Sequence, residues 1–494
     1  MDIITNRRVT IVGGGNAGLL CALILRRAFS EYQITVVKSD KIGTIGVGEG
    51  STEHWRTFMN FAEIEAAELL VGTLATHKKG IRFEGWTNHT PDYFHAISGL
   101  PEGAPFVGEF DGAYAGMVAK GLLFSNTTGF QGIASNHVAA INPHQTVNQF
   151  HFDTAELNDF LIFKCQSRGI KFHEGEVVDV VLSDVDWIES VRLDGEEELI
   201  GSDFWIDASG FNQVLMSRLP GKKWNSFSEY LLTDSAIAFR TPADESGEIR
   251  PYTRARALDN GWAWEIPTQK ERGNGYVYSS QFCSEEQAVA EMETLLDVQI
   301  SDYRHFHFDP GYLEEPWVGN CVAVGLSGSF VEPLEATSIG STVNQSQALL
   351  GFLAPFRKGN EYSVKQYNSK FKIMMLNILD MIRLHYISDR EDTDFWKAQK
   401  EMPIPESLKN LLGVWSERPP EITDIQGAWL MFRVPHFYHV AQGQGKVNRE
   451  AASESITALG LADKIEKYIW KLREHKTSGP VIDHAKALKE ICED

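Results

Sequence analysis

Glycines at a fixed spacing near the N-terminus are the first residues that could do chemistry. Gly13, Gly15 and Gly18 form a GxGxxG pattern that also contains Asn16 and Ala17. In a strand–turn–helix setting the first glycine permits a tight turn and the second lets backbone N–H groups approach a pyrophosphate. The third lets the helix pack closely on the sheet. The pattern favours dinucleotide binding over the alternative, a tight turn without a ligand.

The segments around these glycines predict the elements that position them. A β-branched run at 9–12 precedes the pattern, an apolar helix-like stretch follows at 19–27, and a second strand is expected at 34–37. The three elements form the start of a βαβ unit. An acid normally ends the second strand and binds ribose hydroxyls, but Lys38 stands there. Either Asp40 substitutes for that acid or the ribose contact is lost.

Two further segments are rich in small residues that would let a cofactor approach. The first, IGVGEGST at 45–52, contains a single acid and is as typical of a surface loop as of a cofactor clasp. The second, GSDFWIDASGF at 201–211, is an apolar strand that ends in Asp207 and small residues. Two such strand ends separated by a long insertion indicate one discontinuous FAD-binding domain interleaved with a substrate domain.

The composition excludes several classes of protein. With 494 residues, of which 43% are hydrophobic, the chain has the length of about three structural units and an ordinary globular composition. Its 67 acidic and 46 basic residues give a net charge of −21, which predicts no nucleic acid and no membrane surface as partners. No apolar run approaches the roughly 18 residues of a membrane-spanning helix, no secretory signal is indicated, and the five cysteines never form CxxC. We therefore expect a cytoplasmic protein.

Six motifs follow one another along the chain. They are the GxGxxG pattern, GVGEGST (46–52), GWAWEIP (261–267), GYVYSSQF (275–282), NCVAVGLSGSFVEPLEATSI (320–339) and HYISDREDTDFW (385–396). In sequence and order they resemble the motifs of flavin-dependent halogenases, particularly the tryptophan-halogenase group. The resemblance runs from about Val9 to about Gly445, which is nearly the whole chain.

The resemblance implies that Lys78 and Glu335 are the catalytic pair. Lys78 alone would be taken for a solvated surface lysine, but it falls, rather than Lys79, on the family's lysine position. An ammonium there can hydrogen-bond hypohalous acid or become a haloamine. Glu335 can polarise hypohalous acid and stabilise or deprotonate the cationic ring intermediate, although alone it could equally be a carboxylate near a helix start. Backbone amides around Thr337 and Ser338 then suit a halide ion.

Two tryptophans and a set of smaller residues are implied to surround the cofactor. Trp262 and Trp264 point to the same face of a predicted strand, so the pair alone indicates core packing. The resemblance implies instead a wall that keeps the organic substrate from touching the flavin. It also implies that the cofactor is FAD, used as FADH2, with contacts beyond the GxGxxG turn from Gly48, Glu49, Val177, Leu326 and Ile339.

Two segments resemble substrate-binding parts of the family. In DYFHAISG (92–99), Phe94 and His95 match residues that stack an aromatic substrate. In HFYHVAQGQG (436–445), Phe437 replaces the first tyrosine of a pair that binds the amino-acid part of tryptophan, and only Tyr438 keeps a hydroxyl. Losing a hydroxyl that binds a buried polar group costs roughly 1 to 3 kcal/mol, which disfavours free tryptophan. Other indoles and phenols are the expected substrates, and the alternative is that both segments are simply core.

Together these features predict an α/β fold. We expect an FAD-binding domain of the aromatic-hydroxylase-like type, interleaved with a mixed-sheet substrate domain and followed by a helical C-terminal part. The expected boundaries are 1–100, 150–215 and 315–360 for the FAD-binding domain, 101–149 and 216–314 for the substrate domain, and 361–494 for the C-terminal substrate-binding part. Apolar residues at helical spacing between 461 and 472 predict an amphipathic helix docked on the body or on a partner.

The implied activity uses FADH2, O2 and a halide (chloride, bromide or iodide) to form hypohalous acid, which halogenates an electron-rich aromatic substrate. A separate NAD(P)H-dependent flavin reductase is the expected partner, because the chain has one GxGxxG and no second nicotinamide site. A homo-oligomer is left open, and no metal is expected because no HExxH or comparable ligand set occurs. The main alternative is an FAD-dependent aromatic monooxygenase that hydroxylates its substrate and uses NAD(P)H directly. A non-enzymatic flavin store is the other alternative.

Overall fold

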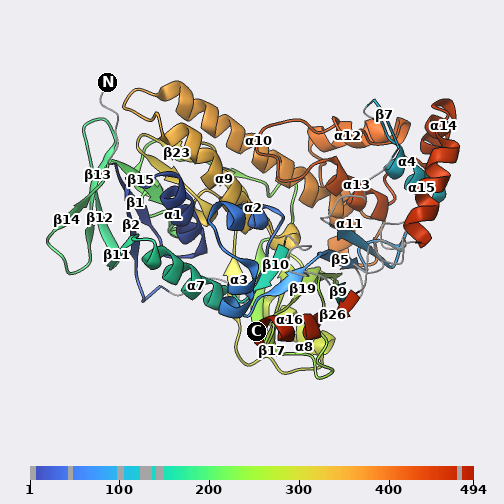
Figure 1. The fold of residues 1–494 in the computed structure, drawn as a ribbon, viewed down its shortest axis with the longest axis horizontal. Helices are drawn as coiled ribbons and strands as arrows, with labels where there is room; N and C mark the ends of the chain where they lie inside the picture. The colour runs from blue at the N-terminus through green and yellow to red at the C-terminus, as the bar shows by residue number, and fades with distance from the viewer. Residues whose placement is uncertain are drawn as a thin grey trace.

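The computed structural model describes residues 7–42, 48–96, 105–108, 110–122, 136–140, 149–474 and 481–493. Residues 46 and 47 of the GVGEGST motif lie outside the described residues. Figure 1 shows strands and helices mixed through the first two thirds of the chain, and a mainly helical region formed by the C-terminal part. The predicted mixed α/β fold with a helical C-terminal part is confirmed.

A six-stranded sheet carries the N-terminal motif. Its order is β11, β2, β1, β15, β24 and β23, and every neighbouring pair is parallel except β23 with β24. The strands are β1 (Arg8–Val12), β2 (Gln33–Lys38), β11 (Lys171–Glu174), β15 (Phe204–Asp207), β23 (Trp317–Val318) and β24 (Cys321–Ala323). They come from three separate stretches of the chain. The carboxyl ends of β1, β2 and β15 meet at one edge, which is where ligands bind in open parallel sheets.

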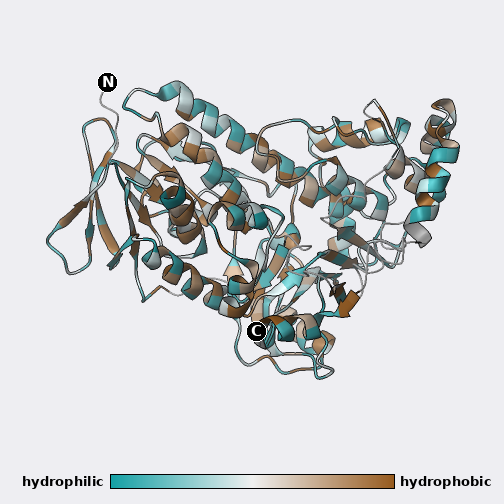
Figure 2. Ribbon diagram, viewed as in Figure 1, coloured by the Kyte–Doolittle hydropathy of each residue, from teal (hydrophilic) through white to brown (hydrophobic). Residues whose placement is uncertain are grey.

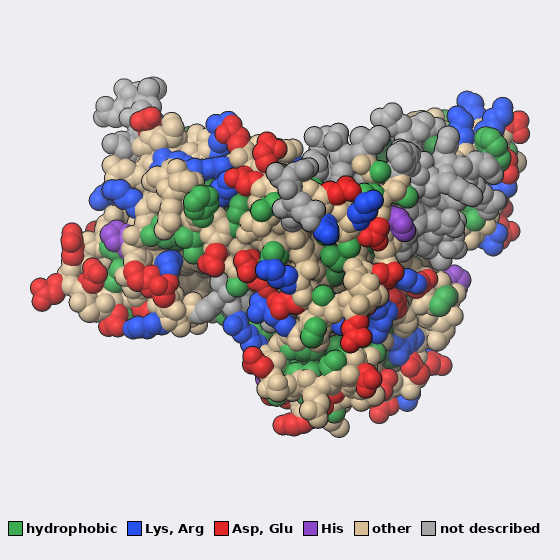
Figure 3. Space-filling model, turned by 60° about the horizontal axis from the view of Figure 1, so that its bottom comes forward, with side chains coloured by type: hydrophobic (Ala, Val, Ile, Leu, Met, Phe, Trp, Pro, Cys, Tyr) green, Lys and Arg blue, Asp and Glu red, His purple; other side chains and the backbone are tan. Residues whose placement is uncertain are grey.

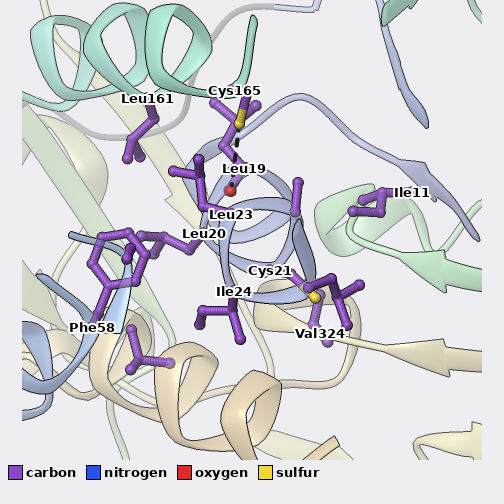
Figure 4. Close-up of a cluster of buried hydrophobic side chains, with 14 of the residues drawn as sticks. Ile11, Leu19, Leu20, Cys21, Leu23, Ile24, Phe58, Leu161, Cys165 and Val324 are labelled. Atoms are coloured by element: carbon purple, nitrogen blue, oxygen red, sulfur yellow. Dashed lines mark hydrogen bonds between the residues drawn. The ribbon is translucent and has the colours of Figure 1, made fainter. Parts of the chain in front are cut away.

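Helix α1 (Asn16–Ala28) connects β1 to β2. It is buried over most of its length, between the sheet, α7 (Thr154–Ser167) and α9 (Thr337–Leu353), which explains why its residues are apolar on nearly every side. Figure 4 shows its side chains packed against those of neighbouring elements, among them Leu19, Leu20, Leu23, Ile24, Phe58, Leu161 and Val324. This packing fixes the start of α1 relative to the edge of the sheet.

A seven-stranded sheet forms the second layer of strands. Its order is β21, β17, β20, β19, β18, β5 and β6, and only β18 with β5 is parallel. The strands are β5 (Gly80–Glu84), β6 (Asp92–Ala96), β17 (Ser235–Pro242), β18 (Thr253–Ala257), β19 (Gly261–Pro267), β20 (Glu271–Tyr278) and β21 (Arg304–His307). The expected first segment, 1–100, thus contributes strands to both large sheets. The domain boundaries themselves stay a prediction.

A small sheet joins the GVGEGST segment to the predicted catalytic lysine. In it β10 (Gln149–Phe152) lies between β3 (Glu49–Gly50) and β4 (Thr76–Lys78), antiparallel to both. The other small sheets contain β12 (Val177–Leu182), β13 (Ile188–Leu193) and β14 (Leu199–Gly201); β16 (Trp224–Ser226), β22 (Gly311–Leu313) and β25 (Ser329–Phe330); β7 (Phe106–Val107) and β8 (Phe110–Asp111); and β9 (His137–Ala139) and β26 (Val481–Asp483).

Helices make up most of the C-terminal part. They are α10 (Glu361–His385), α11 (Asp394–Glu401), α12 (Glu406–Glu417), α13 (Val434–Gly443), α14 (Arg449–Ala458), α15 (Ala462–Glu474) and α16 (His484–Glu493). Earlier helices are α2 (His54–Phe61), α3 (Ala66–Thr73), α4 (Gly112–Lys120) and α8 (Glu285–Leu296). The predicted amphipathic helix is confirmed as α15, whose Ile465 and Ile469 are buried against α4.

The surface combines both charge signs. Figure 2 shows α1 and the strands beside it as mostly hydrophobic, with more hydrophilic residues on the outer helices such as α10. On the face drawn in Figure 3, acidic and basic side chains lie interspersed over the described residues. Among the helices within the described residues, none combines the length and the apolar character needed to cross a membrane.

Candidate active site

A cavity of about 730 Å³ lies at the carboxyl edge of the six-stranded sheet, a volume in the usual range for cofactor sites. It brings together most of the residues that the sequence predicts to contact a flavin. These are Gly13, Gly15, Asn16, Ala17, Asp40, Gly48, Glu49, Val177, Leu326 and Ile339. Trp262, Trp264 and Ser338 line the same cavity. One continuous cavity therefore runs from the glycine turn to the two tryptophans.

The three glycines of the turn differ in what surrounds them. Gly13 has φ +125°, and a Cβ atom there would lie 2.1 Å from the carbonyl oxygen of Ala208, so only glycine fits. A Cβ on Gly18 would lie 2.1 Å from the Gly13 carbonyl oxygen, because α1 crosses the turn closely. A Cβ on Gly15 would meet nothing within 4 Å, since this residue faces the cavity. Of these three glycines, only Gly15 therefore leaves room for a ligand.

The start of α1 fits an anionic group. Gly15 is its N-cap residue, no side chain caps the helix, and no acid lies in its first turn. The first backbone N–H groups of a helix lack partners within it and carry its positive end. With the glycine turn and the cavity beside it, these residues fit the pyrophosphate of a dinucleotide such as FAD.

A carboxylate reaches the expected ribose end of the cavity despite Lys38. The Lys38 ammonium pairs with Asp40 and, at 3.3 Å, with Glu174 at the end of β11. The hydrogen bond that the Lys38 ammonium donates to the Asp40 carboxylate is the largest effect on Lys38 and raises the pKa of its ammonium. The Asp40 backbone N–H also donates to Glu174 Oε1 at 2.6 Å. Lys38 and Glu174 thus hold Asp40 at the cavity, where its carboxylate could accept from ribose hydroxyls.

The positions of Trp262 and Trp264 are compatible with both roles that the sequence left open. Their ring centroids lie 6.0 Å apart and both side chains line the cavity, as a wall at its end would require. Trp262 is also buried in the core, where it packs on Trp86. Its indole N–H points to Glu332 Oε2 at 3.4 Å, and that carboxylate also accepts hydrogen bonds from Thr233 and Tyr386. Burial raises the pKa of Glu332 to about 7.

Lys78 is completely buried, unlike a typical lysine. Its ammonium donates to the Ser51 carbonyl oxygen at 2.9 Å, and a Cβ on Gly50 would lie only 3.0 Å from its Nζ atom. Burial lowers the pKa of Lys78 to about 8, and the charges of Glu335 and Glu53 partly oppose that shift. The glycine in the GVGEGST motif therefore makes room for a buried ammonium.

The neighbouring lysine faces elsewhere. Lys79 follows the end of β4, and its ammonium donates instead to the carbonyl oxygen of His137 at 2.8 Å. The structure thus separates the two lysines that the sequence register left one residue apart, and it places Lys78 within the electrostatic influence of Glu335.

Glu335 is held by two histidines. It ends a short 3-10 turn, Pro333–Glu335, and is buried. His95 Nδ1 lies 2.7 Å from its Oε2 atom, and His385 Nε2 lies 2.6 Å from its Oε1 atom. Burial alone would raise the pKa of Glu335, but His95 and His385 outweigh it and hold that pKa well below its usual range. The carboxylate is therefore ionised although it is out of contact with water.

The residues predicted to bind halide follow directly. Ala336 adopts a left-handed conformation with φ +54°, which turns the chain from Glu335 into α9. Helix α9 begins at Thr337 without a side-chain cap or an acid in its first turn. Thr337 is buried, and Ser338 lines the cavity. The free N–H groups at this helix start lie between the cavity and Glu335, where they suit an anion.

The residues predicted to bind substrate are packed in the protein interior. Phe94 belongs to a buried cluster with Tyr114, Tyr252 and Tyr438. The Tyr438 hydroxyl donates to the Tyr114 carbonyl oxygen at 2.7 Å. Phe437 lies in a different cluster, the main core of the seven-stranded sheet and α10. These placements fit the alternative of core packing, so direct substrate contacts of Phe94, Phe437 and Tyr438 stay a prediction.

The structure adds residues to which the sequence reasoning gave no role. His385 stands in the HYISDREDTDFW motif and His436 begins the HFYHVAQGQG segment, but the sequence assigns no catalytic or binding role to either. Their partners are 50 and 341 residues away in sequence, so no local pattern connects them. Within the described residues, no three or more His, Cys, Asp or Glu side chains are grouped so as to hold a metal ion.

Fold and site together fit an enzyme with a nucleotide cofactor, with two tryptophans lining the cavity and a buried, electrostatically coupled lysine and glutamate. Residues 8–458 match the family model of tryptophan halogenase, and the chain belongs to this family. It is a flavin-dependent halogenase and therefore an oxidoreductase, and a hydroxylase is not favoured.

Comparisons with individual proteins agree. The chain is 32% identical over 450 residues to tryptophan 6-halogenase SttH of Streptomyces toxytricini, covering 85% of each chain. It is 30% identical over 433 residues to tryptophan 7-halogenase RebH of Lentzea aerocolonigenes, covering 83% of this chain and 81% of that one. The structure of BrvH, a flavin-dependent halogenase from Brevundimonas sp. BAL3, matches with a TM-score of 0.86 at 27% identity, covering 98% and 99% of the two chains.

Proposed function

We propose that this protein uses FADH2, O2 and a halide to form hypohalous acid, and that Lys78 and Glu335 transfer its halogen to an electron-rich aromatic carbon. The observation that carries the proposal is a buried, electrostatically coupled Lys78 and Glu335 next to a cofactor-sized cavity. Burying a charged side chain costs free energy, and buried groups whose pKa is strongly shifted by a charged partner cluster at functional sites.

The cavity residues hold the cofactor. The turn at Gly13 and Gly15 and the start of α1 bind the pyrophosphate of FAD, and Asp40 accepts from its ribose. When bound, FAD supplies the electrons that reduce O2 and so the oxidising equivalent for the halide. The first N–H groups of α9, at Thr337 and Ser338, bind that halide.

Trp262 and Trp264 separate the two halves of the reaction. Their two indole rings at the cavity keep an aromatic substrate away from the flavin, whereas hypohalous acid is small and neutral enough to pass. The hydrogen bond to Glu332 holds the indole plane of Trp262 in the wall. A wall of this kind prevents direct hydroxylation of the substrate.

Lys78 and Glu335 then act on the two ends of the transfer. The Lys78 ammonium donates a hydrogen bond to the oxygen of hypohalous acid, which polarises the bond between oxygen and halogen. The aromatic carbon attacks the halogen, that bond breaks, and the oxygen takes a proton from Lys78 and leaves as water. The Glu335 carboxylate stabilises the ring cation and accepts its proton, which returns to Lys78. Atoms and charges balance: substrate and hypohalous acid give halogenated product and water.

The substrate is an indole- or phenol-type compound other than free tryptophan. SttH and RebH are tryptophan halogenases by name, but this chain has Phe437 at one of the two positions expected to bind the amino-acid part. The other, Tyr438, has its hydroxyl engaged with Tyr114. Neither side chain is therefore placed to hold an ammonium or a carboxylate of the substrate. FADH2 comes from a separate NAD(P)H-dependent flavin reductase, as this class of halogenase generally requires.

A mass-spectrometric screen tests the proposal. Purified protein is given chemically reduced FAD, O2, indole or phenol, and chloride, bromide or iodide in separate reactions. We expect halogenated mass shifts from the wild type, their loss in Lys78→Ala, and their retention in the matched control Lys79→Ala. Normal halogenation by Lys78→Ala would refute the assigned mechanism. Oxidation of NADH without a reductase, with a hydroxylated product, would favour the monooxygenase.

A further inference from the structure

His95 has both ring nitrogens engaged inside the protein. It lies in β6, is completely buried, and reaches Glu335 Oε2 through Nδ1 at 2.7 Å. Its Nε2 atom lies 3.0 Å from His436 Nδ1 in α13. An ionised carboxylate only accepts hydrogen bonds, so Nδ1 of His95 carries the proton. The contact between Nε2 and His436 Nδ1 is then a second hydrogen bond of the same ring.

The surroundings of the ring are also occupied. The rings of His436 and His439 meet His95 edge to face at centroid distances of 5.2 and 5.7 Å, and Phe432 lies at 6.4 Å. These rings all come from α13 or the segment just before it. Three neighbouring rings and the hydrogen bonds at both nitrogens therefore hold the His95 ring in one orientation.

We infer that His95 is a positioning residue for Glu335, and that it connects this carboxylate to α13 through His436. The inference rests on the proposed role of Glu335 in halogen transfer. Its atomic basis is a chain of contacts from Glu335 through His95 to His436, whose Nε2 atom lies 3.6 Å from Glu53 Oε1. Glu53 directly follows the GVGEGST segment, so the chain joins the catalytic carboxylate to that segment.

The charged groups around Glu335 determine what His95 contributes. His385 of α10 binds the other carboxylate oxygen, and Lys78 of β4 faces it with a positive charge. From α13 come His436, with a pKa lowered by burial to about 3, and His439, with a pKa that burial also lowers. Arg433, which precedes α13, lowers the pKa of His436, whereas Glu53 raises the pKa of Lys78. Without His95 only His385 and Lys78 would oppose the effect of burial, so the pKa of Glu335 should rise.

Two substitutions distinguish positioning from stacking. His95→Phe keeps a flat ring of similar size and removes the N–H donor, whereas His95→Asn removes the ring and keeps an N–H near the position of Nδ1. A stacking role predicts that His95→Phe is nearly normal and that His95→Asn has a raised KM. A positioning role predicts instead that His95→Phe has a lowered kcat and that His95→Asn is nearly normal.

The kinetic test measures indole bromination with reduced FAD between pH 5 and 9. For His95→Phe we expect kcat to fall by about 10- to 100-fold, the worth of one hydrogen bond to a charged group, with KM changed less than twofold. We also expect a new loss of activity on the acid side, where Glu335 becomes protonated. His95→Asn should recover most of kcat. His305→Phe is the matched control, because His305 pairs with Glu285 at 3.1 Å outside the site.

A second measurement does not depend on activity. Urea unfolding of His95→Phe, Glu335→Gln and the double variant should show non-additive losses, as expected for two residues in direct contact. A normal kcat with raised KM in His95→Phe, or additive unfolding free energies, would overturn the inference. If the wild type halogenates neither indole nor phenol with any of the three halides while the unfolding effects are non-additive, the proposed function fails and the contact stands.

Discussion

Gly15→Ala is the sharpest test of where the cofactor binds. The Cβ atom of alanine would enter open space, and φ −72° with ψ 171° at residue 15 is an ordinary conformation for alanine. Alanine is a poorer helix N-cap than glycine by up to about 1 kcal/mol, and it gains about 0.4 to 1 kcal/mol by restricting the unfolded chain. These terms nearly cancel, so the free energy of unfolding without cofactor should stay within about 1 kcal/mol of the wild type.

Cofactor binding should respond differently. The new methyl group would occupy the space between the N–H groups of α1 and a pyrophosphate, at the cost of at least one hydrogen bond to a charged group. Such a bond is worth about 1.5 to 3 kcal/mol, so the Kd for FAD should rise about 10- to 100-fold. With FAD at 100 times the wild-type Kd, the cofactor stabilises the wild type by about 2.7 kcal/mol, but a variant that binds 100-fold more weakly by only roughly 0.4 kcal/mol.

Fluorescence titration gives the Kd, and urea unfolding with and without FAD gives the stabilisation. Gly413→Ala is the matched control, because a Cβ there also meets nothing within 4 Å but lies in α12, away from the cavity. Gly18→Ala is the opposite control and should destabilise the protein itself, since its Cβ would collide with the Gly13 carbonyl. If Gly15→Ala binds FAD within threefold of the wild type, the pyrophosphate does not lie at the start of α1.

Three further predictions follow from single side chains. The Lys78 ammonium has a pKa of about 8, so halogenation should decline as the pH rises through 8; a rate that rises there would indicate the haloamine route instead. Asp40→Asn should weaken FAD binding about tenfold and leave the Kd of FMN unchanged, because FMN lacks the adenosine ribose; equal effects on both would contradict the ribose contact. Burial lowers the pKa of His484 to about 4 in the folded protein, so the unfolded chain binds its proton first as the pH falls. His484 should therefore lower the free energy of unfolding progressively between about pH 6.5 and 4, by at most about 3 kcal/mol. Between pH 7.5 and 5, the free energy of unfolding measured with urea should fall less for His484→Gln than for the wild type.

Local patterns in the sequence were sufficient for the cofactor half of the molecule. The GxGxxG spacing implies a strand, a turn and a helix in immediate succession, and each glycine is required or permitted by contacts made within that unit or with β15. Lys38 shows what such a local pattern cannot predict. Its departure from the expected acid was visible, but the carboxylate of Glu174 that compensates it comes from β11, more than 130 residues away.

The other half of the site depends on contacts that no spacing encodes. His95, Glu335, His385 and His436 come from a strand, a 3-10 turn and two helices, and only the folded chain brings their nitrogen and oxygen atoms within 3.0 Å. A motif can identify such residues as unusual, but it cannot show whether an imidazole faces a substrate or a carboxylate. Tyr438 illustrates the same limit, because its hydroxyl is engaged by the backbone of Tyr114.

The electrostatics of the catalytic pair show why two histidines are needed beside Glu335. Burial opposes charge on both members, since it lowers the pKa of Lys78 and would raise that of Glu335. Lys78 has one carbonyl acceptor, and the charges of Glu335 and Glu53 only partly oppose burial, so its pKa is about 8 and its proton can be given up and regained. Glu335 has an imidazole on each oxygen and stays ionised. A fixed negative charge beside a readily titrated ammonium is the combination that electrophilic substitution requires, because one group must stabilise a cation while the other supplies a proton.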